Sequence, residues 1–268
     1  MDSRTKDYDK WTAKNAWQCC LALVILNLNV YLIFCIVHRN AVFDHWLTNY
    51  EYPVRNATKI VMAALWLFLA FWLSGVSSIS AFVKRTNLNT GPSLWGWAAA
   101  WIAICIAILD HYWATRGWTS PNSIQRGFYN AGGGSLLFYT IFVSSVGPFF
   151  EEVVMRGFLY TAFRGSKGKL ASTFLTLLVG IYFHRVAIIH SFYTALCLVS
   201  LWVLLCILRE WTNSVWNCVV CHAIYNLSVA IIWQIDVLLM VCLVPFCVYC
   251  SLRGSGLKGA VLTVDTRQ

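Results

Sequence analysis

Long runs of apolar residues that contain no charged side chain follow one another along most of the chain. The clearest two, Trp17–Val37 and Ile60–Val83, are each long enough to cross a bilayer, which takes about 20 helical residues. Because backbone N–H and C=O groups in hydrocarbon must be paired within their own segment, such runs are expected to be helices. The sequence therefore predicts an all-α protein, a bundle of about eight transmembrane helices.

Six further runs have the same apolar character, although the joints after the third and fifth of them are tight. They are Leu94–Leu109, Ser135–Phe150, Ala171–Phe183, Val186–Leu208, Val215–Ile235 and Val237–Leu252. Only 12% of the 268 residues are charged, about half the share that soluble domains carry. This composition excludes an ordinary soluble globule and makes the lipid bilayer a partner of the chain.

The net charge of +9 comes from basic residues that lie between the apolar runs and form no dense patch, which excludes nucleic-acid binding. Lys and Arg gather in the N-terminal tail and in alternate connections. The connections on this side hold Lys84, Arg85, Arg156, Arg164, Lys167, Lys169 and Arg209. Since cytoplasmic loops carry an excess of Lys and Arg, both termini are expected to be cytoplasmic.

Ionisable residues at membrane depth are costly and therefore mark candidate functional sites. The first cluster is Glu151-Glu152 followed by Arg156. On a helix Glu152 and Arg156 are four residues apart and can form an ion pair, whereas Glu151 points about 100° away. An unpaired and desolvated Glu151 would hold a proton more tightly, as a general base requires. The alternative is that all three residues cap a helix end at the membrane surface.

Two histidine positions form the other clusters. His222 and Asn226 are also four residues apart, so an imidazole and a carboxamide project from one face of an apolar helix. This spacing suits two groups that converge on an oxyanion, a water or a metal; the alternative is a pair of hydrogen bonds between helices. His184 follows the run that ends at Phe183 and by itself is typical of a membrane interface.

The stretch GPFFEEVVMRGFLY, Gly147–Tyr160, closely resembles the first signature of the CAAX prenyl protease 2-like intramembrane proteases. This family also holds bacteriocin-processing and abortive-infection proteins of bacteria. The third family signature, a histidine, three residues and an asparagine or aspartate, is matched by His222 and Asn226. His184 stands where the second signature has its histidine, but the phenylalanine expected four residues earlier is Gly180.

The resemblance covers about residues 135–236 and implies that this segment is the catalytic core. The segment 1–134 is then expected to hold N-terminal transmembrane helices, and 237–268 a last transmembrane helix with a cytoplasmic tail. The implied activity is that of an intramembrane endopeptidase, which hydrolyses a peptide bond near the C-terminus of prenylated CAAX proteins or of a related membrane substrate. The implied partner is thus a protein or peptide, in some substrates prenylated.

The resemblance also implies roles for individual residues. Glu151 would activate the attacking water and His184 would complete the site, while Glu152 and Arg156 would orient their helix. The oxyanion of the tetrahedral intermediate would be stabilised by His222 and Asn226. Zinc is the one candidate cofactor, and its ligands would be Glu151, His184 and His222 if the helices converge.

Two other classes of function stay open at this stage. The departure at Gly180 allows a catalytically inactive family member that acts as a membrane scaffold or an immunity protein. A transporter with an ion relay is the second, but neither repeats nor paired Gly/Pro-broken spans are evident. The expected location is the endoplasmic reticulum membrane in a eukaryote and the cell membrane in a bacterium.

Overall fold

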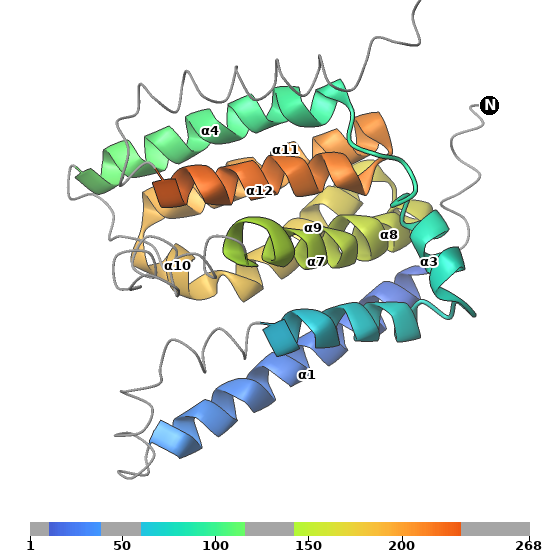
Figure 1. Cartoon of the computed structure of the whole chain (residues 1–268). Helices are drawn as coiled ribbons and strands as arrows, with labels where there is room; N and C mark the ends of the chain where they lie inside the picture. The colour runs from blue at the N-terminus through green and yellow to red at the C-terminus, as the bar shows by residue number, and fades with distance from the viewer. Residues whose placement is uncertain (1–10, 39–59, 116–141, 232–268) are drawn as a thin grey trace, which may run out of the picture.

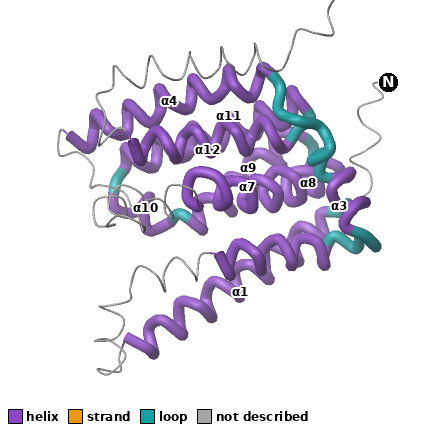
Figure 2. Tube along the Cα trace, in the orientation of Figure 1, coloured by secondary structure: helices purple, strands orange, loops and turns teal. Residues whose placement is uncertain are grey.

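The computed structural model describes residues 11–38, 60–115 and 142–231, which form helices joined by short turns (Figures 1 and 2). No strand occurs within these three ranges. The predicted all-α bundle is therefore confirmed. The expected span Val237–Leu252 and the two chain ends lie outside the described residues.

Three helices lie side by side at one side of the bundle, namely α4 (Leu94–Thr115), α11 (Phe192–Thr212) and α12 (Val215–Ile231) (Figure 1). Ala99, Ala103 and Ala107 recur at every fourth position of α4 and are buried in one cluster with residues of α11 and α12. Small residues at this spacing let helix backbones approach closely. The helix that carries His222 is thus packed tightly against α4.

On the opposite side of the bundle, α1 (Ala13–His38) runs beside the helix Ile60–Leu73 (Figure 1). The Asn15 side chain donates a hydrogen bond of 2.9 Å from Nδ2 to the carbonyl of Leu73 and ties the two together. Buried residues of α1, including Leu23, pack in one cluster with Phe158 and Phe163. These contacts support the central helices from the side away from α4.

A continuous helical rod from Phe142 to Lys167 runs between the two sides. It consists of η3 (Phe142–Val146), α7 (Gly147–Glu152), η4 (Val153–Leu159) and α8 (Tyr160–Lys167), of which η3 and η4 are π-helical. Such π segments are rare and often lie at functional sites. The predicted span that ends at Phe150 in fact continues past both glutamates. The interpretation that they cap a helix end is therefore wrong.

Two predicted spans are broken, and in each the second helix begins at a serine N-cap. Ile60–Val83 divides at Gly75, whose φ of +66° favours glycine, and restarts as α3 (Ile79–Arg85), where the Ser78 hydroxyl accepts a hydrogen bond of 3.2 Å from the Ala81 N–H. Val186–Leu208 divides at Ser191 into α10 (Arg185–His190) and α11. In both places a serine N-cap satisfies the first turn of the next helix.

Two described helices are long and apolar enough to cross a membrane, Leu94–Trp113 and Phe192–Thr212. Three apolar helices are shorter, namely Ile60–Leu73, Lys169–Phe183 (all of α9) and Val215–Val229. Arg156 and Arg209 are 2% and 0% exposed. These two arginines belong to the core, and the expectation that they mark the cytoplasmic face stays a prediction.

Candidate active site

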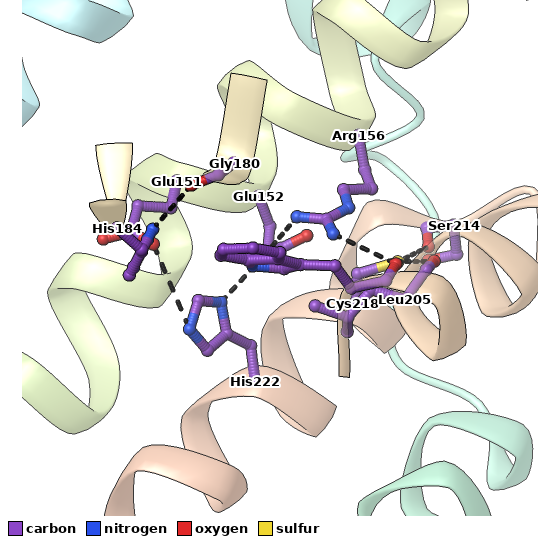
Figure 3. A network of polar contacts seen from close by, with 10 residues as sticks. Glu151, Glu152, Arg156, Gly180, His184, Leu205, Ser214, Cys218 and His222 are labelled. Carbon is purple, nitrogen blue, oxygen red and sulfur yellow. Dashed lines mark hydrogen bonds and ion pairs between the residues drawn. The ribbon is translucent and has the colours of Figure 1, made fainter. Parts of the chain in front are cut away.

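Glu152 lies at the centre of the polar cluster in Figure 3 and is completely buried. Its Oε1 accepts a hydrogen bond of 3.0 Å from a terminal nitrogen of Arg156, and the two side chains form the ion pair predicted from their spacing. The same oxygen lies 2.8 Å from Nδ1 of His222. A buried carboxylate is tolerated when it is paired in this way, so Glu152 is held in one position by two partners.

His222 reaches this cluster from α12 and lies between the two glutamates (Figure 3). A carboxylate oxygen can only accept, so Nδ1 carries the hydrogen in its bond to Glu152. Nε2 is then directed to Glu151, at 4.0 Å from Oε2 of that residue. A carboxylate that fixes one ring nitrogen of a histidine leaves the other nitrogen poised for chemistry.

Glu151 differs from its neighbour in exposure. Its side chain is 36% exposed, whereas that of Glu152 is fully buried. The expectation that adjacent carboxylates meet different surroundings is met, but the expected desolvation of Glu151 is not. Glu151 is the carboxylate that a substrate or water can reach.

His184 lies beside Glu151 in Figure 3, although 32 residues separate them in the sequence. It caps the C-terminus of α9 with φ of −103°, outside the helical range. Its Nδ1 lies 3.1 Å from the carbonyl oxygen of Gly180, which also accepts the backbone N–H of His184 at 3.0 Å. Because a carbonyl can only accept, Nδ1 carries the hydrogen, and Nε2 of a neutral ring keeps its lone pair.

Asn226 follows His222 by one helical turn on α12 and is 8% exposed. The expectation from spacing, that both side chains project from one helix face, agrees with the burial of both. Glu151, Glu152, His184 and His222 are thus brought together from three separate helices or helix ends, with Asn226 one turn from His222.

Two residues of this region are not evident from the sequence as parts of a site. Trp202 of α11 contacts the His184 ring edge to face, with 4.9 Å between ring centroids, and its carbonyl accepts a bond of 3.3 Å from Arg156. Arg209 donates from Nε to the carbonyl of Arg156 at 3.2 Å and from a terminal nitrogen to the Thr161 hydroxyl at 3.3 Å. Arg209 thereby binds to the π-helical segment η4, a role that a count of basic residues near span ends cannot reveal.

The donor side chains of this cluster are not placed to share one metal ion. Within the described ranges no group of three or more His, Cys, Asp or Glu side chains is placed to hold a metal ion. Nδ1 of each histidine already has a protein partner, Glu152 for His222 and the Gly180 carbonyl for His184, so only the two Nε2 atoms of these rings could bind a metal. Zinc takes three protein ligands at about 2.0–2.2 Å, so the proposed set of Glu151, His184 and His222 does not fit it as arranged.

Comparison with known proteins gives one result that bears on this cluster. Residues 133–228 match the family model of type II CAAX prenyl endopeptidases, described as Rce1-like. No curated protein and no solved structure matches significantly. The family and the two long apolar helices together indicate a membrane protein with a protease domain. The matched segment, about a third of the chain, contains all of the candidate site residues and is similar to the Rce1-like domain of the CAAX protease family.

Proposed function

We propose that this chain is a glutamate-dependent intramembrane endopeptidase that removes a short C-terminal peptide from prenylated CAAX proteins. The observation that carries the proposal is that the two glutamates face different nitrogens of the His222 ring and differ in exposure. One carboxylate is buried and bound to Nδ1, and the other is partly exposed and faces Nε2. The family match over residues 133–228 supports the class of reaction and of substrate.

Glu151 acts as the general base in this proposal. Its Oε2 and the Nε2 of His222 are 4.0 Å apart, too far for a direct hydrogen bond and close enough for one substrate or water oxygen to contact both. Glu151 takes a proton from water as the water oxygen bonds to the scissile carbonyl carbon. His184, beside Glu151, accepts from the same water through the lone pair on Nε2.

The tetrahedral intermediate then needs donors for its oxyanion. His222 supplies them when its ring is protonated, because Nδ1–H is bound to Glu152 and Nε2–H remains for the substrate. Asn226 donates from its carboxamide. The C–N bond breaks as Glu151 returns its proton to the leaving nitrogen, which yields a new carboxylate and a free amine.

Glu152 and Arg156 serve as positioning residues. Neither is accessible, at 0% and 2% exposure, so neither contacts substrate. Together they hold Nδ1 of His222 and, through the carbonyl of Trp202, the adjacent helix α11. No step in this mechanism passes through a metal ion.

The compartment follows from the substrate class. Prenylated CAAX proteins are delivered from the cytosol, so in a eukaryotic cell we expect this endopeptidase in the endoplasmic reticulum membrane. A bacterial chain would instead act on a membrane peptide in the cell membrane. A second candidate is an inactive family member that binds partners without cleaving them. Gly180, in the place of the signature phenylalanine, is the observation that favours it.

Purified full-length protein in liposomes, incubated with a farnesylated CAAX peptide, tests the proposal. Release of the C-terminal tripeptide is expected from the wild type and not from Glu151→Gln, which keeps the side-chain shape. Glu210→Gln is the matched control, because Glu210 is likewise a partly buried glutamate, but its partners are Tyr160 and Arg164 and it lies near the C-terminus of α11, away from His222. If folded wild-type protein binds the peptide without cleaving it, the second hypothesis, a catalytically inactive family member, is favoured.

A further inference from the structure

The close approach of α9 and α11 at Gly180 is not explained by backbone conformation, because Gly180 lies within a regular helix. A Cβ atom added at this position would lie 3.2 Å from both Cδ2 and Cε2 of Trp202 and 3.4 Å from Cε3. The indole therefore covers the glycine directly. A Cβ at position 180 would require the indole to shift by a few tenths of an ångström, and a longer side chain by more, so glycine permits the contact at its present distance.

Trp202 is 3% exposed, and its ring meets the His184 ring at an interplanar angle of 66°. Such edge-to-face pairs have a preferred geometry and restrict the rotation of both rings. The carbonyl of Gly180 meanwhile fixes Nδ1 of the same imidazole. Gly180 thus has two effects. Its carbonyl accepts a hydrogen bond from His184, and its lack of a side chain leaves space for the Trp202 indole to contact the His184 ring.

We infer that Trp202 is a positioning residue that keeps the His184 ring turned so that Nε2 faces Glu151. The aromatic side chain that the second signature carries on α9 is absent at position 180, and an indole from α11 fills that place. The departure from the signature is then a relocation of an aromatic contact from one helix to its neighbour. On this inference the altered motif is compatible with a working His184.

This inference rests on the proposed function and is tested with kinetics and with a measurement that needs no activity. Trp202→Ala should lower kcat about 10- to 100-fold with little change in KM, the cost of a catalytic group displaced by about 1 Å. Trp202→Phe should retain more activity. The double variant Gly180→Phe/Trp202→Ala returns an aromatic side chain to α9 and should recover part of the lost kcat.

Trp11→Ala is the matched control. Trp11 is also 3% exposed and makes an edge-to-face contact, with Phe158 at 5.0 Å, but it lies outside the site. Both alanine variants should lower thermal stability, and only Trp202→Ala should lower kcat at a temperature where both are folded. Equal kcat losses in the two variants, or no recovery in the double variant, would overturn the inference.

The second readout is ¹⁵N NMR of histidine-labelled protein in bilayers, with the His184 signal identified by its loss in His184→Gln. The wild type should show the Nδ1–H tautomer alone, and Trp202→Ala a mixture. If no peptide is cleaved but this shift occurs, the proposed protease function fails while the positioning role stands. An unchanged signal in Trp202→Ala contradicts the positioning role, whatever the activity.

Discussion

Replacing Arg156 by methionine removes the charge that faces Glu152 while keeping most of the side-chain volume. Glu152 is fully buried, and its remaining partner is His222, at 2.8 Å from the same oxygen. Removing one partner of a buried ion pair costs about 3–5 kcal/mol. Because the hydrogen bond from His222 to Glu152 remains, we expect a loss at the low end of this range, about 3 kcal/mol. Arg156→Met should therefore reduce the folding equilibrium constant by about two powers of ten.

The assay is equilibrium unfolding in mixed micelles, followed by the fluorescence of the 14 tryptophans. Arg164→Met is the matched control, because Arg164 also binds a glutamate at 3.1 Å but is 28% exposed. Exposed pairs contribute about 0.2–1 kcal/mol, so this variant should remain close to the wild type. Glu152→Gln/Arg156→Met should be more stable than Arg156→Met alone, since no buried charge is left unpaired. If Arg156→Met and Arg164→Met cost the same, the argument from burial fails.

Three further predictions concern the site and its support. Glu152→Gln keeps an acceptor for Nδ1 of His222 but removes the charge that pairs with Arg156 and faces the imidazole ring, so kcat should fall at least about tenfold with KM unchanged, measured with the farnesylated peptide. A change in KM alone would assign Glu152 to substrate binding. Zinc chelators should leave turnover unchanged in the same assay, and a loss that added zinc restores would refute the metal-free mechanism. Gly96→Ala would place a Cβ 2.6 Å from Oδ1 and 3.0 Å from Cα of Asn217. This variant should therefore lower the unfolding free energy by about 1–3 kcal/mol. Gly91→Ala is the control and should leave the unfolding free energy unchanged, because no atom lies within 4 Å of its added Cβ.

Local patterns in the sequence predict the features that depend on neighbours within one helix. The Glu152–Arg156 ion pair and the shared face of His222 and Asn226 follow from a spacing of four residues. The helical class follows from the length of the apolar runs, because hydrocarbon leaves the backbone few other choices. These inferences need no knowledge of how the helices pack.

Features that depend on distant residues could not be predicted in this way. A hydropathy profile averages over many residues and therefore does not detect the breaks at Gly75 and Ser191. Gly75 has a positive φ that ends one helix, and Ser191 is the N-cap at which the next helix begins. The π-helical segment η4 depends in part on Arg209, whose guanidinium binds a carbonyl of that segment from 53 residues away. The contact of Trp202 with Gly180 likewise joins two helices, so neither residue has a local signal.

The buried polar tract on the rod from Phe142 to Lys167 has a consequence for how the protein enters a membrane. Each charged residue at the centre of an isolated helix costs about 2.5–3.5 kcal/mol on insertion scales, and Glu152 and Arg156 can offset this only through each other. The other partner of Arg156, Trp202, is synthesised 46 residues later, and the other partner of Glu152, His222, is synthesised 70 residues later. We therefore expect the rod to stay beside the translocation machinery until α11 and α12 have been synthesised. Variants that weaken those two helices should then lower the yield of inserted protein before they affect catalysis.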